Sequence, residues 1–117
     1  MASLKAFEIN GNNFIFHNES IGNRSGFYHE SELFINDCFQ NSVRIQYYNR
    51  TWESYGFQTS MRKCIFSLIE TETAWLKEDF KKQNNLKSLR GQAKLDFEKI
   101  VNADEKITLL TKAVDTL

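Results

Sequence analysis

The chain has 117 residues, of which 41% are hydrophobic and 26% are charged, a balance typical of one folded domain rather than of a disordered segment. Its 15 basic and 15 acidic side chains give a net charge of zero at neutral pH. This balance disfavours a nucleic-acid binder that works by bulk charge, and it disfavours an acidic mimic of DNA.

The N-terminus lacks the charged region and apolar run of a signal peptide, and no stretch approaches the roughly 18 apolar residues needed to span a membrane. We therefore expect a cytoplasmic protein. Cys38 and Cys64 have no CxxC spacing. We interpret them as small half-buried thiols in a reducing compartment, and a disulfide between them would form only outside the cytosol.

Residues 1–57 predict a four-stranded, mostly antiparallel sheet, because aromatic and β-branched residues alternate with polar ones in short segments. The segments are LKAFEIN, NFIFHNE, ELFIND and SVRIQYYN. NGNN at 10–13 is a strong hairpin signal between the first two. In the last segment Val43, Ile45 and Tyr47 share one face, which we expect to point into the core.

SIGNRSGFYHES, residues 20–31, lies between the second and third segments and is rich in Gly, Asn and Ser. This composition predicts an exposed loop. Its Arg24, Tyr28 and His29 are therefore candidates for contact with a partner.

RIQYYNRTWESYGFQ, residues 44–58, combines aromatic side chains with an arginine at the expected exit from the last strand. An exposed arginine ringed by aromatic residues has the composition of an interaction hot spot. The alternative is a local turn held by Asn49, with an ion pair between Arg50 and Glu53. The candidate partner-binding residues of this stretch are Tyr48, Asn49, Arg50, Trp52 and Glu53.

Apolar residues from 58 to 83 recur at helical spacing and predict a helix that packs on the sheet, which gives an α+β fold. The stripe comprises Met61, Cys64, Ile65, Leu68, Leu76 and Phe80, with Trp75 near its edge. Residues 86–117 continue with a seam of about four heptads. The seam can form one helix or two, with Asp104 as a cap, and it can pack back on the domain or pair with a second copy as a homodimer.

Known catalytic motifs are absent from the sequence, and we expect no enzyme, no cofactor and no metal. His17 and His29 lie near no evident ligand cluster and are interpreted as ordinary surface histidines. An antiparallel sheet with exposed aromatic side chains can stack bases, so a sheet-based single-stranded nucleic-acid or regulatory module stays as an alternative. Tyr48, Arg44 and Arg50 would serve that mode, and Phe16 would join them if its face of the sheet is open.

SGFYHESELF and the later VRIQYYNRTWESYGFQTSM resemble small proteins carried by phages and other mobile elements of Gram-positive bacteria. The resemblance covers residues 26–61, about a third of the chain. It implies a compact accessory protein in the cytoplasm of a bacterial host cell. Its most specific implication is an anti-CRISPR protein that binds a type II effector nuclease and blocks it without mimicking DNA. The alternatives are the nucleic-acid module and a structural protein that self-assembles through residues 86–117.

Overall fold

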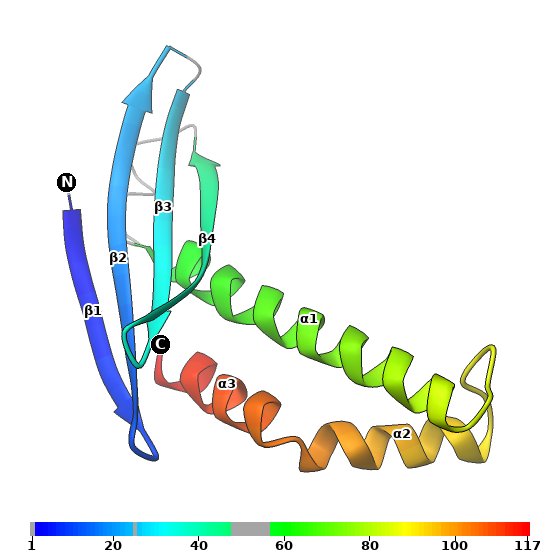
Figure 1. The fold of residues 1–117 in the computed structure, drawn as a ribbon. Coiled ribbons are helices and arrows are strands. Elements are labelled where there is room, and N and C mark those ends of the chain that lie inside the picture. Colours follow the sequence, from blue (N-terminus) through cyan, green and yellow to red (C-terminus); the bar gives the residue numbers. More distant parts are fainter. Residues whose placement is uncertain (1, 25, 48–56) are drawn as a thin grey trace.

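The computed structural model describes residues 2–24, 26–47 and 57–117 (Figure 1). The strands are β1 (Ala2–Ile9), β2 (Asn12–Asn23), β3 (Gly26–Ile35) and β4 (Cys38–Tyr47). The helices are α1 (Gln58–Gln83), α2 (Gln92–Ala103) and α3 (Glu105–Thr116). This is the predicted α+β arrangement, with the sheet first and the helices after it.

The sheet is an antiparallel meander in the order β1-β2-β3-β4. Its first turn is the predicted hairpin, where Asn10 and Gly11 take φ values of 52° and 81°. Asn36 and Asp37 form a second such turn between β3 and β4, with φ values of 51° and 64°. Two successive positive φ angles match the right-handed twist of the flanking strands, and Asn, Asp and Gly adopt them at the least cost.

The prediction of an exposed loop over residues 20–31 is wrong. β2 continues to Asn23 and β3 begins at Gly26, and these two residues pair across the hairpin. The Gly, Asn and Ser content suggested a loop, but Ile21 and Tyr28 lie opposite each other in a regular ladder. Cross-strand pairing of such apolar and aromatic side chains stabilises a sheet and outweighs local composition.

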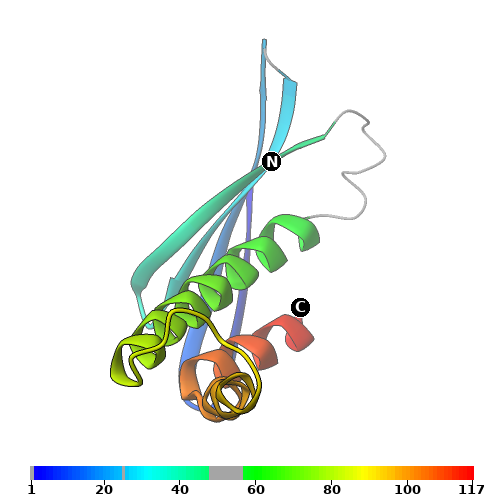
Figure 2. The same cartoon turned by 90° about the vertical axis from the view of Figure 1, so that its right-hand side faces the viewer.

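All three helices lie on one side of the sheet (Figure 2). The core between the two layers is closed by Phe14 and Phe16 of β2, Leu33 of β3, Met61, Cys64 and Ile65 of α1, and Leu110 and Ala113 of α3. Val43 packs against this core, which confirms the inward direction predicted for this residue, whereas the side chain of Tyr47 lies outside the described part of the structure. Burial at about 25 cal/mol per Å² of apolar surface is the main force that holds the layers together.

α1 covers the predicted range, and the first four residues of the predicted stripe pack toward the sheet. Met61, Cys64 and Ile65 are buried, Leu68 is half-buried, and Trp75 is 62% exposed. The stripe is buried only along the first half of α1, because the second half extends beyond the sheet (Figure 1). There α2 packs beside α1, with the rings of Phe80 and Phe97 5.7 Å apart.

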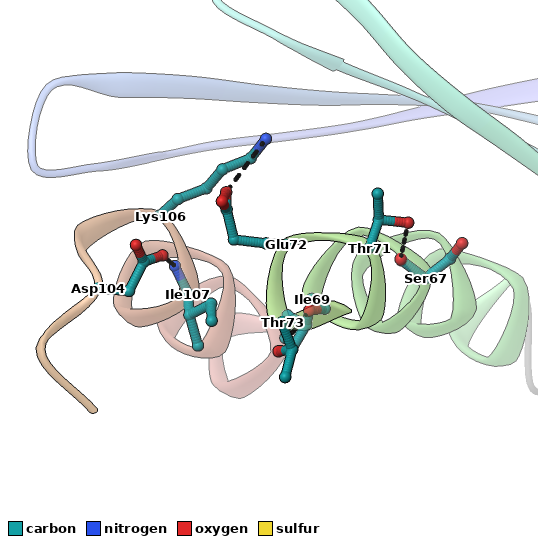
Figure 3. Close-up of polar contacts among 8 residues, drawn as sticks. All are labelled: Ser67, Ile69, Thr71, Glu72, Thr73, Asp104, Lys106 and Ile107. Atoms are coloured by element: carbon teal, nitrogen blue, oxygen red, sulfur yellow. Dashed lines mark hydrogen bonds and ion pairs between the residues drawn. The ribbon is translucent and has the colours of Figure 1, made fainter. Parts of the chain in front are cut away.

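Residues 86–117 contain two helices, and the break lies at the predicted cap. The side chain of Asp104 accepts a hydrogen bond from the backbone N of Ile107 at 3.0 Å, which begins α3 (Figure 3). Lys106 Nζ lies 3.8 Å from Glu72 Oε2 and ties α3 to α1. Since Leu110 is fully buried, this part of the seam packs back on the domain.

Candidate functional site

Five of the predicted partner-binding residues lie outside the described part of the chain: Tyr48, Asn49, Arg50, Trp52 and Glu53. The last described residue before them is Tyr47 at the end of β4, which pairs with Phe27 near the start of β3. The chain therefore leaves the sheet at the end where β2 and β3 are joined.

The other three predicted site residues lie at or near that end of the sheet. Arg24 is exposed beside the β2–β3 turn. Tyr28 is half-buried, and the guanidinium carbon of Arg44 lies 5.6 Å from the centre of its ring, within cation–π range. His29 is only 8% exposed, and its ring lies 4.7 Å from that of Phe57 on the helix side of the sheet. The surface role expected for His29 is therefore wrong, because strand alternation turns this residue inward.

The main surface that the structure assembles is the side of the sheet that faces away from the helices, which we call the outer face. In a strand, neighbouring residues point to opposite sides, so the residues that alternate with the buried Phe14, Phe16 and Leu33 form this face. Its members are Ala2, Leu4, Ala6, Glu8, Asn13, Ile15, His17, Glu19, Ile21, Tyr28, Glu30, Glu32, Phe34, Phe39, Ser42, Arg44 and Gln46. No element among the described residues covers it (Figures 1 and 2).

An apolar row crosses the outer face over all four strands. The ladder places Ala6, Ile15, Phe34 and Phe39 side by side, from β1 to β4. The ring of Phe34 lies 5.6 Å from that of Phe39, in an edge-on arrangement. The side chain of Phe39 is 56% exposed. Leu4, in the adjacent row, is 69% exposed. With strands about 4.8 Å apart, the row is roughly 14 Å long.

Carboxylates flank this apolar row on both sides. Among the described residues, the outer face carries four glutamates and one arginine: Glu8, Glu19, Glu30, Glu32 and Arg44. Arg44 forms an ion pair within the face, because its Nη2 lies 2.7 Å from Glu30 Oε2. The other three glutamates have no ion-pair partner within the described part of the chain. The outer face is thus locally acidic although the whole chain is neutral.

A buried polar cluster lies between the sheet and the start of α1. Ser31 Oγ donates to Asn18 Oδ1 at 2.7 Å and lies 2.6 Å from Ser60 Oγ. The Cys64 thiol donates to the Ser31 carbonyl at 3.3 Å, and burial raises the pKa of this thiol to about 11. Ser31 and Ser60 are 0% and 1% exposed, so no substrate reaches their hydroxyls. Their bonds satisfy polar groups in the core.

The two cysteines differ in their exposure to solvent. Cys38 is exposed and Cys64 is buried, and both are free thiols. The prediction that both are half-buried is therefore wrong for each. Within residues 2–24, 26–47 and 57–117, no group of three or more His, Cys, Asp or Glu side chains could hold a metal ion.

The apolar row of the outer face is not among the sites predicted from the sequence, which lie in residues 20–31 and 44–58. The sequence feature that indicates this row is the apolar character of the residues between the core positions. Ile15 and Phe34 alternate with buried aromatic and aliphatic residues, so both faces of the central strands carry apolar side chains. An antiparallel sheet with one solvated face normally alternates apolar with polar residues.

No helix of the described residues is both long and apolar enough to cross a membrane. Comparison of the chain with protein-family models, with curated proteins and with solved structures finds no significant match. The resemblance of residues 26–61 to phage proteins therefore stays a prediction.

Proposed function

We propose that the protein is a non-enzymatic accessory factor that binds another protein through the outer face of its sheet. The observation that carries this proposal is the apolar row with Phe39 56% exposed and Leu4 69% exposed beside it. Contiguous apolar side chains on a folded surface, rimmed by polar groups, mark interaction sites. The glutamates at the rim favour a partner surface that presents Lys or Arg around an apolar centre.

The charge of the outer face also separates this proposal from the nucleic-acid alternative. Base stacking on a sheet needs cations nearby to neutralise phosphates. Here Arg44 is paired with Glu30, Glu19 lies directly opposite Glu30 in the same row, and Glu32 lies in the adjacent row. Phe16, which would stack bases only on an open face, is buried in the core. These carboxylates would repel a phosphate backbone, so a cationic protein surface fits the face better.

The most specific form of the proposal takes its partner from the resemblance of residues 26–61. In this form the partner is a type II CRISPR effector nuclease of a Gram-positive host. Cleavage by such nucleases requires a conformational change in which a nuclease domain docks, and a protein bound to that domain can block it. Because the whole chain is neutral, we expect it to block catalysis or a conformational change and to compete weakly with DNA.

The test is affinity capture from a Gram-positive host lysate, followed by a DNA-cleavage assay with a panel of type II effectors. The diagnostic variant is Phe39→Ser, and its matched control is Phe66→Ser on α1, where the side chain is 46% exposed. An exposed aromatic anchor in an interface contributes about 2 kcal/mol or more, so Phe39→Ser should weaken capture and inhibition at least tenfold. Phe66→Ser should leave both unchanged.

Two results would count against the proposal in different ways. If Phe39→Ser and Phe66→Ser capture the same partner equally, the outer face is not the binding surface, and a third variant, Tyr48→Ala/Arg50→Ala, tests the stretch after β4. If every effector in the panel cleaves normally with the wild-type protein present, the anti-CRISPR form of the proposal is wrong.

A further inference from the structure

The helices carry a second charged surface, of opposite sign to the outer face. Residues 77–94 contain six Lys or Arg side chains and two Asp or Glu side chains. This segment comprises the end of α1, the connection to α2 and the first turn of α2. We call it the arm tip, because Figure 1 shows it at the end of the helical pair that extends beyond the sheet.

Most Lys and Arg side chains of the arm tip form no ion pair within the described part of the chain. Lys81 is bound to Glu78 at 3.1 Å. The exposed cations without an ion-pair partner among the described residues are Lys77, Lys82, Lys87, Arg90 and Lys94. Leu86 and Leu89 lie between them and are half-buried. The arm tip thus presents leucines next to Lys and Arg, the chemistry that suits the outer face.

The arm tip cannot reach the outer face of its own molecule. All three helices lie on the opposite side of the sheet, and the arm extends away from it (Figures 1 and 2). α1 alone is 26 residues long, about 39 Å at 1.5 Å per residue. A contact between the two surfaces therefore requires a second copy of the chain.

We propose that the arm tip of one copy docks on the outer face of another, so that the protein self-associates through unlike surfaces. The inference rests on the proposed function, because it takes the outer face to be a docking surface. Two such contacts related by a two-fold axis close a dimer, and a single contact repeated without closure extends a chain of copies. The second copy occupies the face that the partner needs, so partner binding and self-association exclude each other.

The first test is sedimentation velocity over a wide range of protein concentration at low and high salt. Exposed charges act over about 30 Å at 0.01 M salt and about 3 Å at 1 M salt. The sedimenting mass should rise with concentration at low salt and return to that of the monomer at high salt. A monomer at every concentration in low salt refutes self-association and leaves the partner-capture test of the outer face unaffected.

Charge reversal then identifies the surfaces. Glu19→Lys/Glu32→Lys alters the outer face, and Lys87→Glu/Arg90→Glu alters the arm tip. Each double variant alone should stay monomeric at low salt. An equal mixture of the two should assemble, and so should one chain that carries all four changes, since both bring the new lysines of an outer face to the new glutamates of an arm tip.

A control is needed because each double variant also changes the net charge by four. Glu98→Lys/Asp115→Lys makes the same change as the outer-face variant, at two exposed positions on α2 and α3. It should assemble like the wild type. If it stays monomeric too, or if the wild type assembles and both reversed variants still do, the proposed contact is wrong and an interface such as the seam of residues 86–117 explains the assembly.

Discussion

The clearest prediction from the two-sided sheet compares one leucine on each face. Leu33 is 0% exposed in the core, whereas Leu4 is 69% exposed on the outer face. Leu33→Ala removes buried methyl groups and leaves a cavity, which costs about 2–5 kcal/mol. Leu4 has about a third of its surface covered, and since full burial of a leucine is worth about 1.5–3 kcal/mol, Leu4→Ala should cost only about 0.5–1 kcal/mol.

Urea unfolding followed by far-UV circular dichroism measures both values. With a slope of about 2 kcal/mol per M, Leu33→Ala should lower the unfolding midpoint by about 1–2.5 M, and Leu4→Ala by about 0.25–0.5 M. Capture of a partner should show the reverse order at a temperature where both variants are folded, with the larger loss for Leu4→Ala. Equal destabilisation by the two changes would refute the separation of the sheet into a core face and a binding face.

Three further predictions concern the core and the helices. A maleimide should label Cys38 alone in the native protein and Cys64 only after unfolding; labelling of both in the native state would contradict the packing. Because burial raises the pKa of Cys64 to about 11, the folded chain keeps a proton that the unfolded thiol loses near pH 8.5. Stability from this group is complete below pH 8 and falls by up to about 3 kcal/mol by pH 11, a loss that unfolding curves should show for the wild type and not for Cys64→Ala. Asp104→Ala removes the cap of α3 and should cost about 1 kcal/mol, while an unchanged midpoint would show that the cap contributes nothing.

Much of the fold follows from local patterns that the sequence displays. Alternation of apolar and polar residues predicts the strands, NGNN predicts the first hairpin, and helical spacing predicts α1. Each of these patterns depends on residues close together in the chain. Asp104 was recognisable as a cap since its side chain bonds to a backbone group only three residues later. The β2–β3 hairpin was missed because its stability comes from pairs such as Ile21 and Tyr28, which local composition does not report.

The candidate site was harder to predict because it is made by strand register. Ile15, Phe34 and Phe39 are separate along the chain, and only the ladder places them in one row. Which face the helices cover also depends on tertiary packing. His29 illustrates this dependence. A polar residue in a Gly-rich segment suggests a surface position, but the strand register directs this side chain toward Phe57 in the interior.

The most direct test of the outer face is methyl-resolved NMR of the protein titrated with the partner that the wild type captures. Leu4 and Ile15 report on the outer face, and Leu33 reports on the core side of the same sheet. We expect binding to shift or broaden the methyl signals of Leu4 and Ile15 and to leave those of Leu33 unchanged. Unchanged signals on the outer face, with shifts confined to α1, α2 or α3, would contradict the proposal that this face binds the partner.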